Sequence, residues 1–152
     1  MQPILANKGL FNCSATKYVA VDCEMVGVAI GTNTNRQKSV LARATVVNEH
    51  LNVVYDTFVR PEEKVVDFRT WVSGVRPRHL NKAPRFEEVK EKIAELLRDK
   101  IIVGHALNND FKVLEHSHPQ HLIRDTAKYP PFTKDGKSAR SLKNLSKDIL
   151  VS

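Results

Sequence analysis

The stretch AVDCEMVG, residues 20–27, puts two carboxylates at the end of an apolar run that begins at Tyr18. Such a run is typical of a strand that is buried on both faces, and a buried strand seldom ends in paired charge. Residues i and i+2 of an extended chain point the same way, so we expect Asp22 and Glu24 to project side by side. The stretch therefore predicts a central strand that delivers two like charges to one place.

A third carboxylate follows a second apolar strand. The run KIIVG, residues 100–104, predicts another buried strand, and Asp110 comes shortly after it. We expect Asp110 to lie at the mouth of this strand, on the same rim as Asp22 and Glu24. Each acid also has a purely structural interpretation, because Asp is common where strands stop and in the first turn of helices. On that alternative, the three acids stabilise the fold and bind nothing.

The chemistry of three neighbouring carboxylates favours a metal site. Ionised carboxylates within a few ångströms repel one another unless a cation lies among them. Hard oxygen ligands without His or Cys suit Mg²⁺ or Mn²⁺. Two such ions, about 3.5–4 Å apart, can bind the attacking and leaving oxygens of a phosphodiester. Asp22, Glu24 and Asp110 therefore predict a site for two Mg²⁺ or Mn²⁺ ions.

The rest of the chain predicts an α/β fold, with a mixed five-stranded sheet flanked by helices. After the first strand we expect a polar loop over residues 27–39, then a hairpin formed by residues 40–48 and 51–59. The helical stripe in residues 85–98 predicts the first helix. The remaining elements are a helix capped by Asn108, a short strand over residues 121–126 and a final amphipathic helix over residues 138–150.

Composition limits the class of protein without deciding its function. The chain has 152 residues, a formal net charge of +7, 41% hydrophobic and 27% charged residues, as expected of one globular domain. The positive charge is compatible with a polyanionic partner but does not require one. Cys13 and Cys23 show no metal-thiolate spacing, so we expect no structural zinc. We also expect no secretory leader and no membrane span.

Seven segments, in order, resemble the DEDDh group of 3′–5′ exonucleases, in particular its RNA exonuclease 4 branch and the interferon-stimulated relative. The segments are VAVDCEMVG, LARATVVN, VYDTFVRP, VVDFRTWVSGVRP, IIVGHALNNDFKVL, HPQHLIRDTAKYPPF and RSLKNLSKDIL. The resemblance runs from about Tyr18 to the last residue, so we expect a tail over residues 1–17 and an exonuclease domain over residues 18–152. It implies a ribonuclease H-like fold, two divalent cations, and removal of nucleotides from 3′ ends of RNA or also single-stranded DNA. It also implies RNA processing, including that of rRNA, in the nucleus or nucleolus.

The resemblance assigns roles to the three acids. Asp22 and Glu24 match the first motif of the group, where Asp22 would bridge both ions and Glu24 would hold one ion and contact the 3′ end. Asp110 matches the acid of the second motif.

Three further residues match positions that lie near the substrate in this group. Met25 and Arg69 would approach the last ribose, and His105 would lie near the site within the second motif. The ordinary alternatives are core packing for Met25 and a surface ion pair for Arg69.

The third motif of the group, His-x4-Asp on a later helix, has no match before the sequence ends at Ser152. We therefore expect an exonuclease domain that is incomplete at its C-terminus, with C-terminal helices missing. A missing general base costs about 10²–10⁴-fold in rate, so this chain alone is expected to be weak or inactive. Asp125 resembles an Asp that supports the fold, not a replacement ligand. The alternative function is a nucleic-acid-binding or assembly module without turnover; the sequence predicts no particular protein partner.

Overall fold

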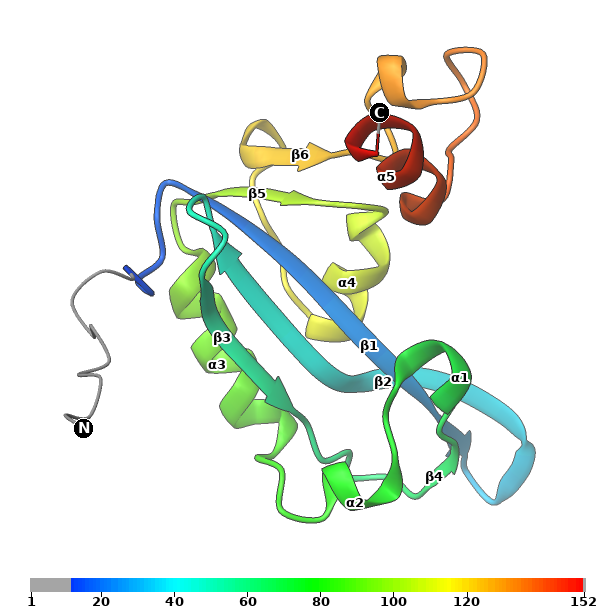
Figure 1. The fold of residues 1–152 in the computed structure, drawn as a ribbon. Helices are drawn as coiled ribbons and strands as arrows, with labels where there is room; N and C mark the ends of the chain where they lie inside the picture. Colours follow the sequence, from blue (N-terminus) through cyan, green and yellow to red (C-terminus); the bar gives the residue numbers. More distant parts are fainter. Residues whose placement is uncertain (1–11, 152) are drawn as a thin grey trace, which may run out of the picture.

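The computed structural model describes residues 12–151 and contains one mixed, six-stranded sheet (Figure 1). The strands are β1 (Tyr18–Ile30), β2 (Asn33–Asn48), β3 (Val53–Phe58), β4 (Val65–Asp67), β5 (Ile101–Gly104) and β6 (Ile123–Asp125). Their order is β3-β2-β1-β5-β6, and β4 pairs with the far end of β1. The predicted mixed sheet and the hairpin β2–β3 are confirmed, with β1–β2 and β2–β3 antiparallel and β1–β5 and β5–β6 parallel. The predicted count of five strands is wrong, because the three residues of β4 are too few to show an alternating pattern.

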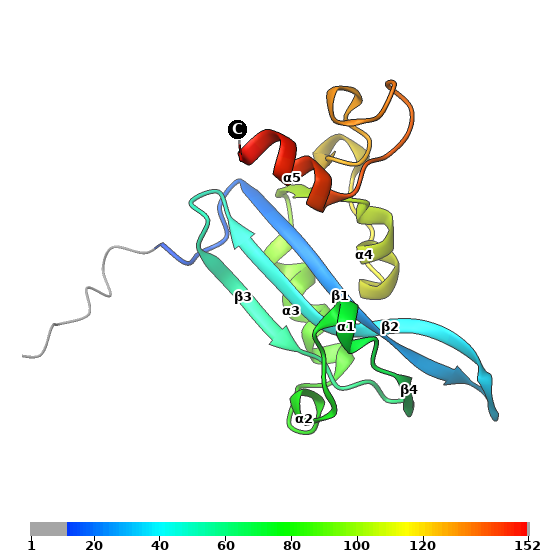
Figure 2. The ribbon, with the colours of Figure 1, turned by 45° about the vertical axis from the view of Figure 1, so that its right-hand side comes forward.

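Helices cover the two faces of the sheet unequally. The helices are α1 (Thr70–Ser73), α2 (Pro77–Leu80), α3 (Phe86–Leu97), α4 (Leu107–Leu114) and α5 (Leu142–Leu150), with short 3-10 turns η1 (Gln120–Leu122) and η2 (Pro130–Phe132). α3 and α4 lie along one face, whereas α1 and α5 lie near opposite ends of the other face (Figures 1 and 2). The part of that second face that carries Tyr18, Ala20 and Asp22 is exposed, and we call it the open face. The helices in residues 12–151 are all too short or too polar to cross a bilayer.

The main hydrophobic core lies between the sheet and α3. Strand β1 contributes Val19, Val21 and Cys23, which alternate with exposed residues of the open face. Helix α3 contributes Val89, Ile93 and Leu97, and this spacing confirms the helix predicted over residues 85–98. Each fully buried Val, Leu or Ile side chain contributes about 1.5–3 kcal/mol. This core fixes which face of β1 points away from α3, and that is the face that carries Asp22 and Glu24.

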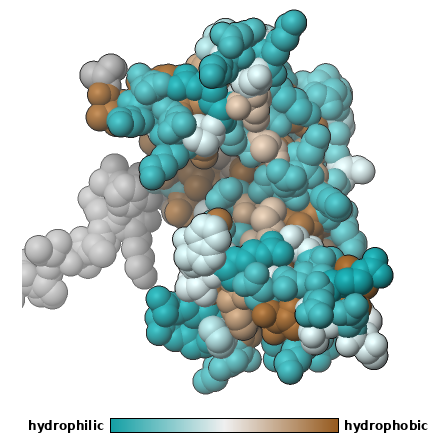
Figure 3. Space-filling model, turned by 90° about the vertical axis from the view of Figure 1, so that its right-hand side faces the viewer, coloured by the Kyte–Doolittle hydropathy of each residue, from teal (hydrophilic) through white to brown (hydrophobic). Residues whose placement is uncertain are grey.

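A smaller core covers the lower half of the opposite face. It consists of Val26, Ala42, Val75 and Leu80, so the segment with α1 and α2 packs over the middle of β1 and β2. From the side, hydrophobic residues gather in a hollow between largely hydrophilic upper and lower parts of the molecule (Figure 3). Glu24 precedes Val26 on the same face of β1, so it lies where the cover provided by this smaller core ends.

The predicted polar loop over residues 27–39 is wrong. Strand β1 continues to Ile30 and β2 begins at Asn33, with paired residues from Val26↔Val40 to Ile30↔Asn33. Gly31 has φ +62°, a left-handed conformation that glycine adopts without steric cost, and it forms the tight turn. The polar residues lie on an exposed two-stranded arm, where backbone pairing continues without an apolar face. A sequence pattern that looks for alternation therefore misses this extension.

The segment before β1 is bonded to the turn between β2 and β3. The buried Asn48 side chain donates to the carbonyls of Asn12 and Ser14, at 2.6 and 3.1 Å, and accepts from the amides of His50 and Asn52 at 3.0 Å each. Of the tail predicted over residues 1–17, residues 1–11 lie outside the described residues.

The cap of α4 comes from another strand. The helix begins at Leu107, and the Asp125 carboxylate of β6 accepts hydrogen bonds from the amides of Ala106 (2.8 Å) and Leu107 (3.0 Å). Asp125 also accepts from the Ala127 amide at 2.9 Å. The predicted Asn108 cap is wrong, since Asn108 lies inside the helix. The prediction that Asp125 supports the fold is confirmed.

Candidate functional site

The three predicted acids meet where β5 separates from β1. The two strands pair only from Tyr18 to Ala20, so the amide of Cys23 lies beyond the end of this ladder. The N–H of Cys23 donates to Oδ1 of Asp110 at 2.9 Å. Asp110, in the first turn of α4, is thus bonded to the backbone between Asp22 and Glu24. The predicted position of Asp22 at a strand end is wrong, because β1 continues beyond it; what ends there is the pairing with β5.

The register of β2 decides what lies opposite the acids. Asp22 is paired with Thr45 and Glu24 with Arg43, so these four side chains share the open face. Immediately afterwards the register shifts, because Met25 is paired with Leu41. This β-bulge leaves Ala42 as the extra residue of β2. Bulges often occur beside active sites, where they redirect side chains.

Burial and mutual repulsion disfavour the ionised acids. Burial, and then the charge of Asp22, raise the pKa of Asp110 to about 6, although the bond from the Cys23 amide opposes this shift. The pKa of Asp22 is raised by burial and lowered in part by the Cys23 amide and Arg43. The pKa of Glu24 is raised by burial and by Asp22. The site therefore attracts either protons or cations.

The pKa of Asp110 gives a pH-dependent stability. Because the pKa rises from 3.8 to about 6 on folding, the folded chain binds the proton more tightly, and stability falls as pH increases across this interval. The loss is about 3 kcal/mol at most, if the whole shift is realised. Asp110→Asn keeps an acceptor for the Cys23 amide and removes the titration. Urea unfolding between pH 4 and 7 without metal should show the variant gaining stability over the parent as pH rises; parallel curves would contradict this expectation.

Two of the three acids, Asp22 and Asp110, line a large cleft of about 950 Å³. Among its lining residues are six acids and two lysines: Asp22, Glu62, Glu63, Glu87, Asp110 and Glu115, with Lys38 and Lys112. One of the lysines, Lys38, is already paired with Glu63 at 2.7 Å. The positive net charge of the chain is therefore not concentrated in this cleft, and a polyanion would need cations to enter it.

The other three predicted site residues surround the cleft. Met25 packs against the main core and also lines the cleft, so the core-packing interpretation holds as well. His105 lines the cleft after β5, and its Nδ1 shares a hydrogen bond with the Thr126 hydroxyl at 2.9 Å. Arg69 donates from Nη1 to the hydroxyl of Ser39, a lining residue, at 2.8 Å, and so reaches the rim.

Arg69 also forms the surface ion pair that its ordinary interpretation predicts, since its Nε lies 3.8 Å from Asp67 Oδ2.

Arg43 was not predicted as part of the site. Arg43 lies opposite Glu24, directly beside the bulge in β2. The sequence indicates such a bulge only through the core residues Leu41 and Ala44, which are three positions apart and not two or four.

The donor set is suited to a hard divalent cation but is not a complete shell. A divalent cation prefers oxygen ligands, and its charge would stabilise the ionised form of the three acids, whose pKa values are raised. Within residues 12–151, however, no three or more His, Cys, Asp or Glu side chains are already arranged to hold a metal ion. The carboxylates of Asp22, Glu24 and Asp110 are thus chemically suited to a divalent cation, and a bound ion would need further ligands.

Comparisons with known proteins agree along nearly the whole chain. A family model described as Exonuclease matches residues 19–149. Proteins named RNA exonuclease 4 are 51% identical over 134 residues (Mycosarcoma maydis) and 50% identical over 136 residues (Mus musculus). These matches cover 88% and 89% of this chain but only 35% and 31% of those proteins. RNA exonuclease 4 of Saccharomyces cerevisiae is 47% identical, over 88% of this chain and 46% of that protein. The chain therefore spans about a third to a half of the length of these curated relatives.

Solved structures share the fold. The pseudoubiquitin-hydrolase–RNase module of Saccharomyces cerevisiae PAN2 superimposes with a TM-score of 0.73 and 27% identity, over 90% of this chain and 24% of that chain. A Pan2 module from the same organism in complex with A7 RNA gives a TM-score of 0.72 and 27% identity, over 90% and 24%.

Proposed function

Because this chain belongs to the exonuclease family, whose model spans residues 19–149, we propose that it is the catalytic domain of a 3′–5′ exoribonuclease. The sheet and its flanking helices form the family's ribonuclease H-like fold. RNA as substrate is supported by the relatives named RNA exonuclease 4 and by Pan2 modules solved with RNA. Single-stranded DNA is a second substrate class. The observation that carries the proposal is the bond between Asp110 and the Cys23 amide, which brings the third acid to Asp22 and Glu24.

Divalent cations are the proposed cofactors, as is general for the family, and we propose two Mg²⁺ or Mn²⁺ ions. Asp22, Glu24 and Asp110 would hold them, and the bound ions would stabilise the attacking and leaving oxygens of a phosphodiester. The Cys23 amide fixes the Asp110 carboxylate before any ion binds. The acid-rich cleft repels RNA until cations offset its charge, so metal binding and substrate binding are expected to be coupled.

The remaining site residues would position the end of the strand. Met25 offers an apolar contact within the cleft, and Arg69 offers donors at its rim. His105 follows directly after β5, and its ring is held by a hydrogen bond with the Thr126 hydroxyl. In this position it would contact the substrate beside Asp110. A role in RNA processing, including that of rRNA, in the nucleus or nucleolus is proposed from the family resemblance.

A nuclease assay on the purified protein tests the proposal. The substrate is single-stranded RNA with a 5′ label, incubated with Mg²⁺ or Mn²⁺ and sampled over time. We expect products that shorten one nucleotide at a time from the 3′ end, and no products with EDTA. Tight RNA binding without any cleavage would instead support the alternative, a nucleic-acid-binding module of the same fold. Cleavage that persists in EDTA would contradict the metal mechanism.

A further inference from the structure

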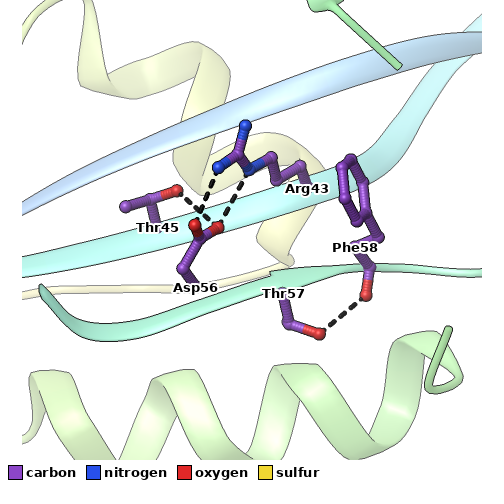
Figure 4. Close-up of polar contacts among 5 residues, drawn as sticks. All are labelled: Arg43, Thr45, Asp56, Thr57 and Phe58. Atoms are coloured by element: carbon purple, nitrogen blue, oxygen red, sulfur yellow. Dashed lines mark hydrogen bonds and ion pairs between the residues drawn. The ribbon is translucent and has the colours of Figure 1, made fainter. Parts of the chain in front are cut away.

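The open face of the sheet carries an arginine that is unusually well fixed. Arg43 donates from Nε and Nη2 to the two carboxylate oxygens of Asp56, at 2.9 and 2.7 Å (Figure 4). Thr45 donates its hydroxyl to Asp56 at 3.1 Å, and the guanidinium lies 5.3 Å from the centroid of the Phe58 ring. Neighbours on β2 and β3 thus set the plane of the guanidinium.

The position of Arg43 relative to the acids suggests more than an ion pair. Arg43 is the direct partner of Glu24 across the sheet, and residues so paired have Cβ atoms about 4.5–5.5 Å apart. Its hydrogen bonds nevertheless go to Asp56, on the other side. Exposed ion pairs of this kind contribute little to stability, so stability alone does not account for the arrangement.

Part of the guanidinium remains available to a ligand. An arginine has five N–H donors, and Asp56 uses only two of those of Arg43. Nη1 has no hydrogen-bond partner among residues 12–151 and points away from Asp56 in Figure 4. About 40% of the side chain is exposed. The unused donors therefore form a charged, planar fork beside Glu24, and such a fork matches the oxygens of a phosphate.

We propose that Arg43 binds a backbone phosphate of the RNA strand at the open face, and that Asp56 is the positioning residue that holds it there. This inference rests on the proposed function, since it places a phosphate contact beside the same acids. The bond from Arg43 lowers the pKa of Asp56, so the pair stays charged. Asp56 also keeps Arg43 from closing onto Glu24, which leaves that acid available for a cation.

RNA binding at a series of salt concentrations tests the phosphate contact. The probe is a fluorescein-labelled single-stranded oligoadenylate, followed by anisotropy with Ca²⁺ in place of Mg²⁺. Loss of one phosphate contact lowers the slope of log affinity against log salt by about 0.7 on single strands. We expect Arg43→Gln to lower the slope by that amount and affinity by about ten-fold, the size of one charge-assisted hydrogen bond. Arg140→Gln is the matched control, because it breaks another exposed Arg–Asp pair and should leave the slope unchanged.

Two further variants keep the test decisive. Arg43→Lys retains the charge but cannot engage Asp56 and a phosphate together, so it should keep the slope and lose affinity. Asp56→Asn should likewise lower affinity without lowering the slope, because the cation remains but its position is lost. Binding by folded Arg43 variants equal to that of Arg140→Gln would overturn the inference and leave the proposed function intact. Failure of the unchanged chain to bind RNA would overturn both.

Discussion

Asp22→Asn is expected to lower the affinity of this chain for Mn²⁺ by about 100-fold or more. Even residues that only orient metal ligands cost about 10–100-fold in affinity when replaced, so loss of a direct ligand should cost at least as much. Asn keeps the shape of the side chain and removes the charge that raises the pKa values of Glu24 and Asp110. Titration with Mn²⁺, followed by electron paramagnetic resonance of the free ion, measures the effect directly.

The stability of the same variant separates a metal site from a structural one. Asp22 is partly desolvated and its pKa is raised, so its charge is unfavourable in the metal-free chain. Asp22→Asn should therefore leave stability unchanged or increase it in EDTA, whereas a fold-stabilising acid would lower it on replacement. The control is Asp99→Asn, in the turn between α3 and β5, where the left-handed φ of 59° suits Asn. Equal Mn²⁺ affinities for the two variants would favour the structural interpretation of the acids.

Asp125→Ala is expected to destabilise the chain by about 3 kcal/mol, through loss of bonds to a charged acceptor and unpaired amides. The carboxylate accepts from the amides of Ala106, Leu107 and Ala127, and so joins β6 to the start of α4. For a chain of this size the melting temperature should fall by about 10 °C. Thermal melting followed by circular dichroism checks the shift.

Graded replacements show whether the amide bonds cause this loss. Asp125→Asn keeps one acceptor oxygen and should be intermediate. Asp148→Ala removes an exposed acid that is paired with Arg140, and should change stability by less than about 1 kcal/mol. A loss from Asp125→Ala no larger than that from Asp148→Ala would show that α4 does not depend on its cap. Because α4 carries Asp110, destabilisation at Asp125 should also weaken Mn²⁺ binding.

The elements that sequence predicts well are those with a buried face. The alternation of Val19, Val21 and Cys23, and the spacing of Val89 and Ile93, give β1 and α3 because one side of each must be apolar. The arm beyond Val28 escapes prediction, since its backbone pairs without burying side chains. Strand β4 escapes because three residues cannot show a period.

The proximity of the three acids could be predicted from the sequence, but the residues that surround them could not. Asp22, Glu24 and Asp110 each come after an apolar run of the sequence, and parallel pairing of β1 with β5 brings those segments together. The contact through the Cys23 amide depends on where the β1–β5 ladder stops, which no local pattern encodes. The cap from Asp125 and the place of Arg43 depend on long-range register in the same way.

Because Ala42 is an extra residue in β2, the alternation of inward and outward side chains changes between the two halves of that strand. Leu41 and Ala44 both reach the main core although three positions separate them, which a regular ladder would not allow. The half of β2 that carries Arg43 and the half that forms the arm thus pair with β1 in different registers. The arm lies beyond the bulge, so a change in its length need not turn Arg43 away from Glu24.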